Sequence, residues 1–62
     1  MALFYDPKDA VDQIRIESIL KQHNIVYSLH PEPVTGEGPM QIYVADKDLP
    51  RAENLIMQHL DH

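Results

Sequence analysis

Alternation of apolar and polar positions marks two stretches of the chain, and a third stretch is short, apolar and aromatic. Residues 40–45 alternate cleanly, and residues 25–30 do so in the same way. Residues 2–5, with the sequence Ala-Leu-Phe-Tyr, form the third stretch. Strands favour such residues because they pack well on a pleated surface. The pattern therefore predicts three strands, at 2–5, 25–30 and 40–45.

The stretch from about residue 8 to residue 23 contains no glycine or proline, and it predicts a helix. Asp6 and Pro7 precede it, where Asp is a good N-cap and proline suits the first turn. Asn24 follows as a left-handed cap. The apolar residues lie on two opposite faces at about 100° per residue. One face holds Ile16, Ile19, Leu20 and His23, and the other holds Ala10, Val11 and Ile14.

A second helix is predicted over 49–60, with Asp48 as its cap and Pro50 in its first turn. Its apolar stripe is broad enough to cover a sheet, while Met57 lies off it. The stripe consists of Ala52, Leu55, Ile56, His59 and Leu60.

The segment 31–39 contains three prolines and two glycines, which predicts a loop joining two strands as a hairpin. A right-handed crossover through the first helix places the first strand next to the third. We therefore expect one α+β domain over 1–62, a two-layer βαββα arrangement with an antiparallel or mixed three-stranded sheet and two helices on one face. Its predicted core is Ile16, Leu20, Ile42, Val44, Ala52, Leu55 and Ile56.

Composition narrows the possible partners. Five Lys and Arg stand against ten Asp and Glu, a net charge of −5, and the basic residues are scattered. Nucleic acid and anionic membranes attract clustered basic residues, so we expect neither as a partner. No apolar run approaches a membrane span, no secretory signal is seen, and cysteine is absent. We expect a cytoplasmic protein without disulfides or thiolate chemistry.

Four histidines are the strongest chemical signal. His59 and His62 are three residues apart, a spacing that some metal sites use, so they are weak metal candidates. Polar histidines near a helix C-terminus are the ordinary alternative, and a remote site built from His23, His30 and His59 is a further one. We expect no native metal or cofactor. The segment 35–38 is a weak candidate for a phosphate nest, against a simple hairpin turn.

No cluster of residues points to catalysis, and we expect a protein that is not an enzyme. Asp6, Asp9 and Asp12 lie three apart at a helix N-terminus, where capping and solvation explain them. The three tyrosines fall on the three predicted strands and are expected to pack on the sheet.

Several segments carry a family resemblance. Asp6 and Pro7, then residues 19–25 (ILKQHNI), 38–44 (GPMQIYV) and 48–56 (DLPRAENLI), resemble the prokaryotic signal-transducing protein family. That family is a bacterial domain of unknown function, grouped with the PII-like regulators. The resemblance covers most of the chain and implies a βαββα half of a ferredoxin-like sheet, a bacterial origin and a regulatory role. It implies no catalytic residues, and Asn24 stands where relatives tend to have glycine.

The functional expectation is a small regulatory or protein-interaction module that acts as a homodimer. A small core gains from association, and the first strand lacks the charge and proline that protect sheet edges. The interface candidates are Leu3, Phe4, Tyr5, Val11 and Ile14. The alternatives are a small-ligand sensor for a nucleotide or metal in the PII manner, and a monomer whose irregular first turn folds Val11 inward.

Overall fold

The chain folds into three strands and two α-helices in the order βαββα, as the sequence predicts. The computed structural model describes residues 1–31 and 38–60. Its elements are β1 (Ala2–Tyr5), α1 (Ala10–Gln22), β2 (Tyr27–His30), β3 (Gln41–Val44) and α2 (Leu49–Leu60), with a short 3₁₀ helix, η1 (Asp46–Asp48), directly before α2. Asp48, the predicted cap of the last helix, is thus the last residue of a 3₁₀ turn that leads into that helix.

The sheet has the strand order β1-β3-β2, so the predicted adjacency of the first and third strands is confirmed. β3 runs antiparallel to both neighbours, and the sheet is entirely antiparallel. Tyr43 lies opposite Leu3 on one side and opposite Ser28 on the other. The register of β1 shifts between Leu3 and Tyr5, which places an irregularity at Phe4.

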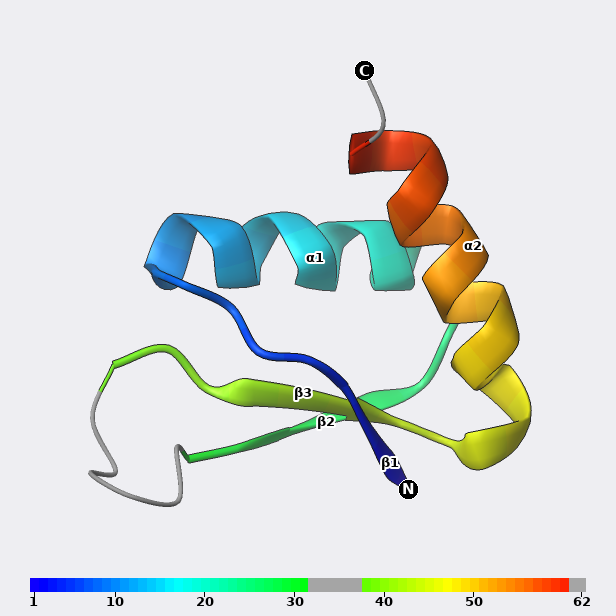
Figure 1. The fold of residues 1–62 in the computed structure, drawn as a ribbon, viewed down its shortest axis with the longest axis horizontal. Coiled ribbons are helices and arrows are strands. Elements are labelled where there is room, and N and C mark those ends of the chain that lie inside the picture. The colour runs from blue at the N-terminus through cyan, green and yellow to red at the C-terminus, as the bar shows by residue number, and fades with distance from the viewer. Residues whose placement is uncertain (32–37, 61–62) are drawn as a thin grey trace.

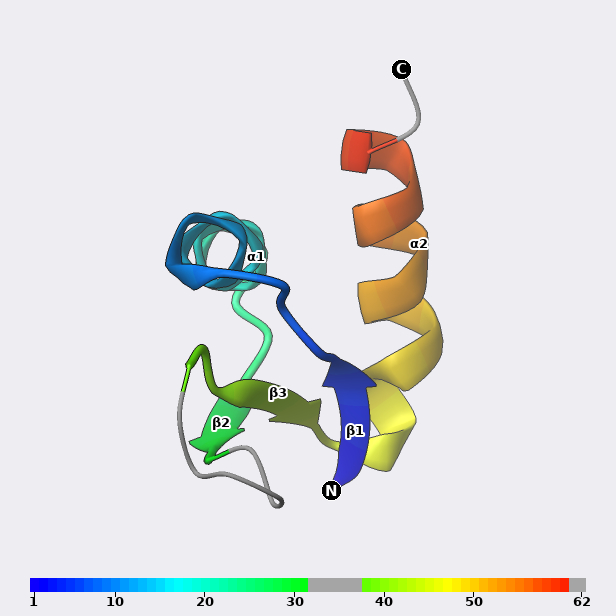
Figure 2. The same cartoon turned by 60° about the vertical axis from the view of Figure 1, so that its left-hand side comes forward.

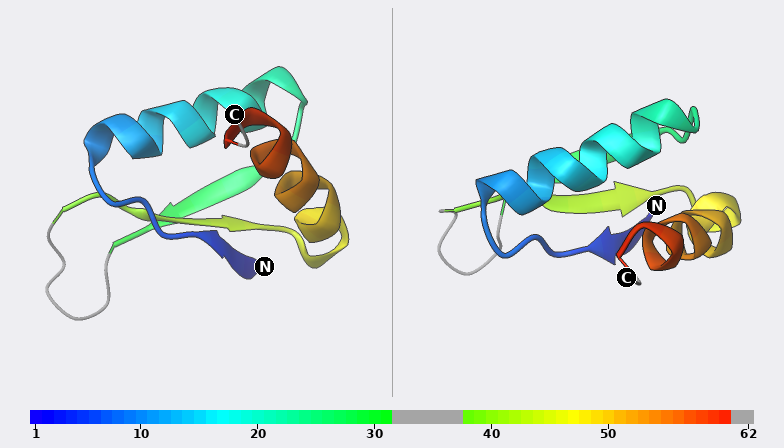
Figure 3. Two further views of the ribbon diagram at one scale, coloured as in Figure 1. Left: turned by 45° about the horizontal axis from the view of Figure 1, so that its top comes forward. Right: turned by 90° about the horizontal axis from the view of Figure 1, so that it is seen from above.

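Both helices lie on the same side of the sheet, as Figures 1 and 2 show; α1 runs over the strands, whereas α2 rises steeply from the sheet and passes the C-terminal end of α1 (Figure 3). The other face carries no layer among the elements described. The arrangement is a two-layer α+β domain, compatible with a truncated ferredoxin-like fold. In the described ranges, no helix combines the length and apolar character that crossing a bilayer requires.

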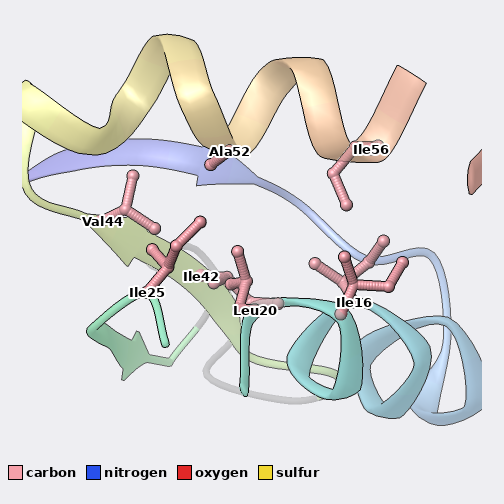
Figure 4. Packing of buried hydrophobic residues seen from close by; sticks show 8 residues of the cluster. Ile16, Leu20, Ile25, Ile42, Val44, Ala52 and Ile56 are labelled. Carbon is pink, nitrogen blue, oxygen red and sulfur yellow. The ribbon is translucent and has the colours of Figure 1, made fainter. Parts of the chain in front are cut away.

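The core lies between the helices and β3 (Figure 4). Six of the seven residues predicted for it are buried: Ile16, Leu20, Ile42, Val44, Ala52 and Ile56. Leu55 is only half-buried, which corrects the prediction, because it lies at the edge of the stripe whose centre is held by Ala52 and Ile56. Ile19 and Ile25 complete the core.

The start of α1 corrects the sequence analysis. The N-cap is Asp9 rather than Asp6: its backbone is extended, and its Oδ1 accepts a hydrogen bond from the backbone N–H of Asp12 at 2.7 Å. Asp6 and Pro7 belong to the non-helical segment between β1 and α1, and the helix begins at Ala10.

The end of α1 agrees with expectation. His23 is the C-cap, and Asn24 has a φ of 57°, the left-handed conformation that closes a helix. The backbone N–H of Ile25 then donates to the carbonyl of Leu20 at 3.0 Å, which turns the chain toward the sheet. β2 starts only at Tyr27, two residues later than predicted, because Ile25 is used in this turn and is buried there.

Candidate interaction surface

The uncovered face of the sheet has no partner layer in the described structure. Ile42 and Val44 point into the core, so Gln41 and Tyr43, which alternate with them on β3, point to the other face. Residues directly opposite one another in an antiparallel pair share a face. Leu3 and Ser28 lie opposite Tyr43, and His30 lies opposite Gln41. We call Leu3, Ser28, His30, Gln41 and Tyr43 the open-face cluster.

The strands that form this face carry no formal charge. The chain has fifteen charged residues, ten Asp and Glu and five Lys and Arg. None of them falls within β1, β2 or β3. The cores of protein interfaces are depleted of charged residues and enriched in aromatic residues, whereas ordinary exposed surface is not. The open-face cluster shares with interface cores the lack of charged residues and contains one aromatic residue, Tyr43.

Side chains within the cluster are ordered against one another. The rings of His30 and Tyr43 lie 4.4 Å apart between centroids, at a tilted angle. The Oγ of Ser28 is 3.1 Å from Nε2 of His30. Leu3 stays 47% exposed beside them. The result is a partly apolar surface with the His30 imidazole and the Ser28 hydroxyl at one side.

The strands β1 and β2 form the two edges of the sheet. Each edge presents backbone groups that another strand can pair with, and charges or prolines are the usual protection. β1 has neither, as predicted, but it is short and its register shift is a form of protection that the sequence did not reveal. The edge of β1 is thus less available than its composition alone indicates.

The structure divides the five predicted interface residues into three groups. Leu3 belongs to the open-face cluster, whereas Phe4 and Tyr5 are half-buried and pack against the core. Val11 and Ile14 are 67% and 63% exposed on α1. They lie about 160° to 220° around the helix from Ile16, so they point away from the sheet. Leu3 and the α1 pair are therefore on opposite sides of the molecule, and no single flat interface covers both. In the monomer alternative, the inward position of Val11 is wrong, because Val11 is exposed.

Tyr5 and Asp12 form a polar contact that the sequence analysis missed. The hydroxyl of Tyr5 donates to Oδ2 of Asp12 at 2.8 Å, and the same oxygen accepts from the backbone N–H of Lys8 at 3.2 Å. Asp12 is only 6% exposed, so the expectation that it is solvated is wrong. A signal was available, because Asp12 lies four residues before Ile16 and so shares its buried face. Burial, together with the bond to Asp12, raises the pKa of Tyr5 above its ordinary value.

A parallel contact joins β2 to α1. The hydroxyl of Tyr27 donates to Oε1 of Glu17 at 2.8 Å. Burial, followed by this bond to Glu17, raises the pKa of Tyr27 to about 12. Tyr5 and Tyr27 thus tie the strands on the two edges of the sheet to the same helix, which keeps the sheet in place beneath α1. The expectation that tyrosines pack on the sheet holds for these two, with a hydroxyl partner in addition.

The histidines are arranged differently from the predicted pair. His59 is exposed, and its ring centroid lies 6.4 Å from that of His23, edge to face. His62, the predicted partner of His59, lies outside the described residues. Residues 35–37 of the candidate phosphate nest also lie outside them, and Gly38 adopts a φ of 81°. Within the described part of the chain there is no pocket and no group of three or more His, Cys, Asp or Glu placed to hold a metal ion.

Sequence spacing could not have paired His23 with His59, because the two residues come from different helices. The contact depends on how α2 crosses the end of α1, where the guanidinium of Arg51 donates to the backbone carbonyl of His23 at 2.9 Å. Comparison of the chain with protein-family models, with curated proteins and with solved structures found no match.

Proposed function

We propose that this chain is a non-enzymatic interaction module that acts by self-association, with the open-face cluster of one copy packed on that of a second copy. The observation that carries the proposal is the complete lack of Asp, Glu, Lys and Arg in the three strands of a chain that is 24% charged. A solvent-facing sheet surface ordinarily carries polar and charged residues in alternation with its buried ones.

The distribution of charged residues favours a second copy of the chain as the partner that binds this face. Each chain has a net charge of −5, so two copies repel wherever their carboxylates meet. The acidic residues of the described structure lie on the helices, on η1 and in the segment before α1. The open-face cluster brings none of them into contact, so this face offers two like-charged molecules an approach with the least repulsion. A strongly basic partner would instead favour the acidic helical side.

Geometry sets the strength of the association. Two sheets pack face to face about 10 Å apart, and a two-fold axis makes the surfaces self-complementary. Four residues extend about 13 Å and three strands span about 14 Å, so the sheet face offers roughly 200 Å². A standard stable interface buries about 800 Å² per partner. We therefore expect a weak, reversible dimer that forms at high micromolar concentration rather than a permanent one.

Reversible association suits a regulatory role. The resemblance of residues 38–44 and 48–56 to the prokaryotic signal-transducing protein family supports such a role, in a bacterial cytoplasm, as part of the same proposal. A module that exchanges between monomer and dimer near its working concentration responds to small changes in that concentration.

Sedimentation equilibrium from about 10 μM to 1 mM tests the proposal, because the expected dissociation constant falls in this range. Two variants place a lysine on the face from different strands: Leu3→Lys on β1 and Ser28→Lys on β2. Both are expected to stay monomeric up to 1 mM while retaining the wild-type circular dichroism spectrum. Ile14→Lys adds the same charge at an exposed apolar position on the other side of the molecule, and it is expected to dimerise as the wild type does.

Three results would overturn the proposed arrangement. A wild-type mass that stays monomeric at 1 mM removes self-association altogether. Dissociation by Leu3→Lys alone would move the contact to the edge of β1. Dissociation by Ile14→Lys alone would move it to the outer side of α1. Phe4, which the sequence offers as an interface residue, is unsuitable for this test because it packs against the core.

A further inference from the structure

The C-terminal ends of the two helices bring two imidazoles together from residues far apart in the sequence. His23 caps α1, and His59 lies in the last turn of α2. Their ring centroids are 6.4 Å apart. Figure 1 shows the second half of α1 beside α2, and the Arg51 guanidinium holds the two helices together there through its bond to the His23 carbonyl. This pair takes no part in the proposed self-association, because it lies on the helical side.

The spacing of the pair is close to that of two histidines that share one metal ion. With Zn–N bonds of about 2.0–2.1 Å and a tetrahedral angle, the two ring centroids lie roughly 5 Å apart. The observed separation is wider by about an ångström, so binding requires one of the two side chains to move toward the other. His59 is exposed on the surface of α2 and His23 is only half-buried, so neither ring is locked in the core.

Electrostatics at this place favour a cation. The C-terminus of a helix carries a partial negative charge, and the two imidazoles belong to the last turns of two helices. The whole chain adds a net charge of −5. Arg51 opposes this effect as a nearby positive charge, although its guanidinium is engaged with the His23 carbonyl.

We propose that His23 and His59 together bind a late-transition divalent cation of the Zn²⁺ class, which links the end of α1 to the last turn of α2. Imidazole nitrogen is a ligand that zinc, copper and nickel accept. Two protein ligands leave the remaining coordination positions to water, so the affinity is modest compared with that of a closed four-ligand site. The ion acts as a staple between two helix ends, and it stabilises the folded chain because only the folded chain holds the two rings together.

The test is thermal unfolding of the untagged chain, followed by circular dichroism with and without ZnCl₂ in the absence of chelator, and calorimetric titration of the same ion. A ligand that binds the folded state alone raises the Tm as its concentration exceeds the dissociation constant. We expect a rise of several degrees at 1 mM ZnCl₂, reversed by EDTA. His23→Ala and His59→Ala are each expected to abolish the rise and to weaken binding at least tenfold.

Two histidine variants serve as matched controls. His30→Ala and His62→Ala remove the same side chain elsewhere, and both are expected to keep the Zn²⁺-dependent rise. If His62→Ala loses the Zn²⁺-dependent rise in Tm and His23→Ala keeps it, the site consists of His59 and His62, and the proposal is overturned. A Tm that Zn²⁺ leaves unchanged, or a rise that survives both His23→Ala and His59→Ala, would also overturn it. If His23→Ala unfolds the chain, His23→Gln replaces it in the test, because glutamine keeps a polar C-cap of similar size. His23→Gln is also expected to lose Zn²⁺ binding.

Discussion

Removing one hydroxyl group from Tyr5 tests the contact that ties β1 to the start of α1. The hydroxyl donates to Oδ2 of Asp12 at 2.8 Å, and Asp12 is only 6% exposed. Tyr5→Phe keeps the ring, so the packing of β1 against the core is retained. The substitution removes one of the two hydrogen-bond donors to Oδ2 of the buried Asp12 carboxylate. The backbone N–H of Lys8 remains as the other donor.

The expected loss of stability follows from this geometry. A hydrogen bond to a charged group contributes about 1.5–3 kcal/mol to stability, and the cost of leaving a buried acceptor without its donor lies in the same range. Because the backbone N–H of Lys8 still donates to Asp12, we expect a loss of stability in the lower part of this range, about 1.5–2 kcal/mol. The total stability of a chain of this length is about 3–9 kcal/mol, so the effect is a sizeable share. It corresponds to a fall in Tm of roughly 6–15 °C for a domain of this size.

Urea denaturation followed by circular dichroism measures the free energy of unfolding. Tyr27→Phe is the matched control, because its hydroxyl donates to Oε1 of Glu17 at the same distance but Glu17 is only half-buried. Water can replace the lost donor at Glu17, so the control is expected to cost about 0.5–1 kcal/mol. A double-mutant cycle of Tyr5→Phe with Asp12→Ala isolates the pair. Equal losses for the two tyrosine variants, or a coupling energy near zero in the cycle, would refute the reasoning.

Three further effects follow from the described geometry. Asn24→Gly should raise stability by up to about 1 kcal/mol in thermal unfolding, because the φ of 57° suits glycine better than asparagine; an unchanged or lower Tm would contradict this. Ile42→Ala should cost about 2–5 kcal/mol, and Leu55→Ala less, because Ile42 is fully buried and Leu55 only half-buried; the reverse order in urea denaturation would contradict it. The free energy of unfolding should fall as pH rises from about 10 to about 12, because the unfolded chain releases the Tyr27 proton at lower pH than the folded chain does. Thermal unfolding across this pH range measures the effect, and Tyr27→Phe should reduce the fall.

Periodicity predicted the architecture well where one residue pattern had a single structural meaning. The alternation around Ile42 and Val44 fixed which side of β3 is buried, and the stripe of α2 fixed the side that faces the sheet. The strand order followed from chain connectivity and the handedness of the crossover. Errors occurred at the ends of elements, where Asp6 and Asp9 are both chemically suitable caps. The hydrogen bond that the backbone N–H of Asp12 donates to the Asp9 carboxylate identifies the cap, and the sequence pattern alone does not distinguish the two residues.

The candidate sites were harder to predict because they depend on tertiary neighbours. Asp12 belongs to a row of three aspartates that read alike in the sequence, yet only this one turns beneath the helix toward Tyr5. Val11 and Leu3 look equally available as exposed apolar residues, but the fold places them on opposite sides of the molecule. His23 meets His59 only because α2 crosses the end of α1. Helical spacing places Asp12 on the face of Ile16, but it does not reveal the contact of Asp12 with Tyr5 or that of His23 with His59.

The strand order has a consequence for how the chain folds as it is made. β1 and β2 are not neighbours in the sheet, and each pairs only with β3, which is the last of the three strands in the sequence. At about 5–20 residues per second, synthesis needs roughly 2–8 s to reach Val44 after Tyr5 has been added. During that interval β1 and β2 have no native strand partner, while α1 can already form from local contacts. Both strand pairings therefore require β3, and a nascent chain that ends before Gln41 contains no native sheet.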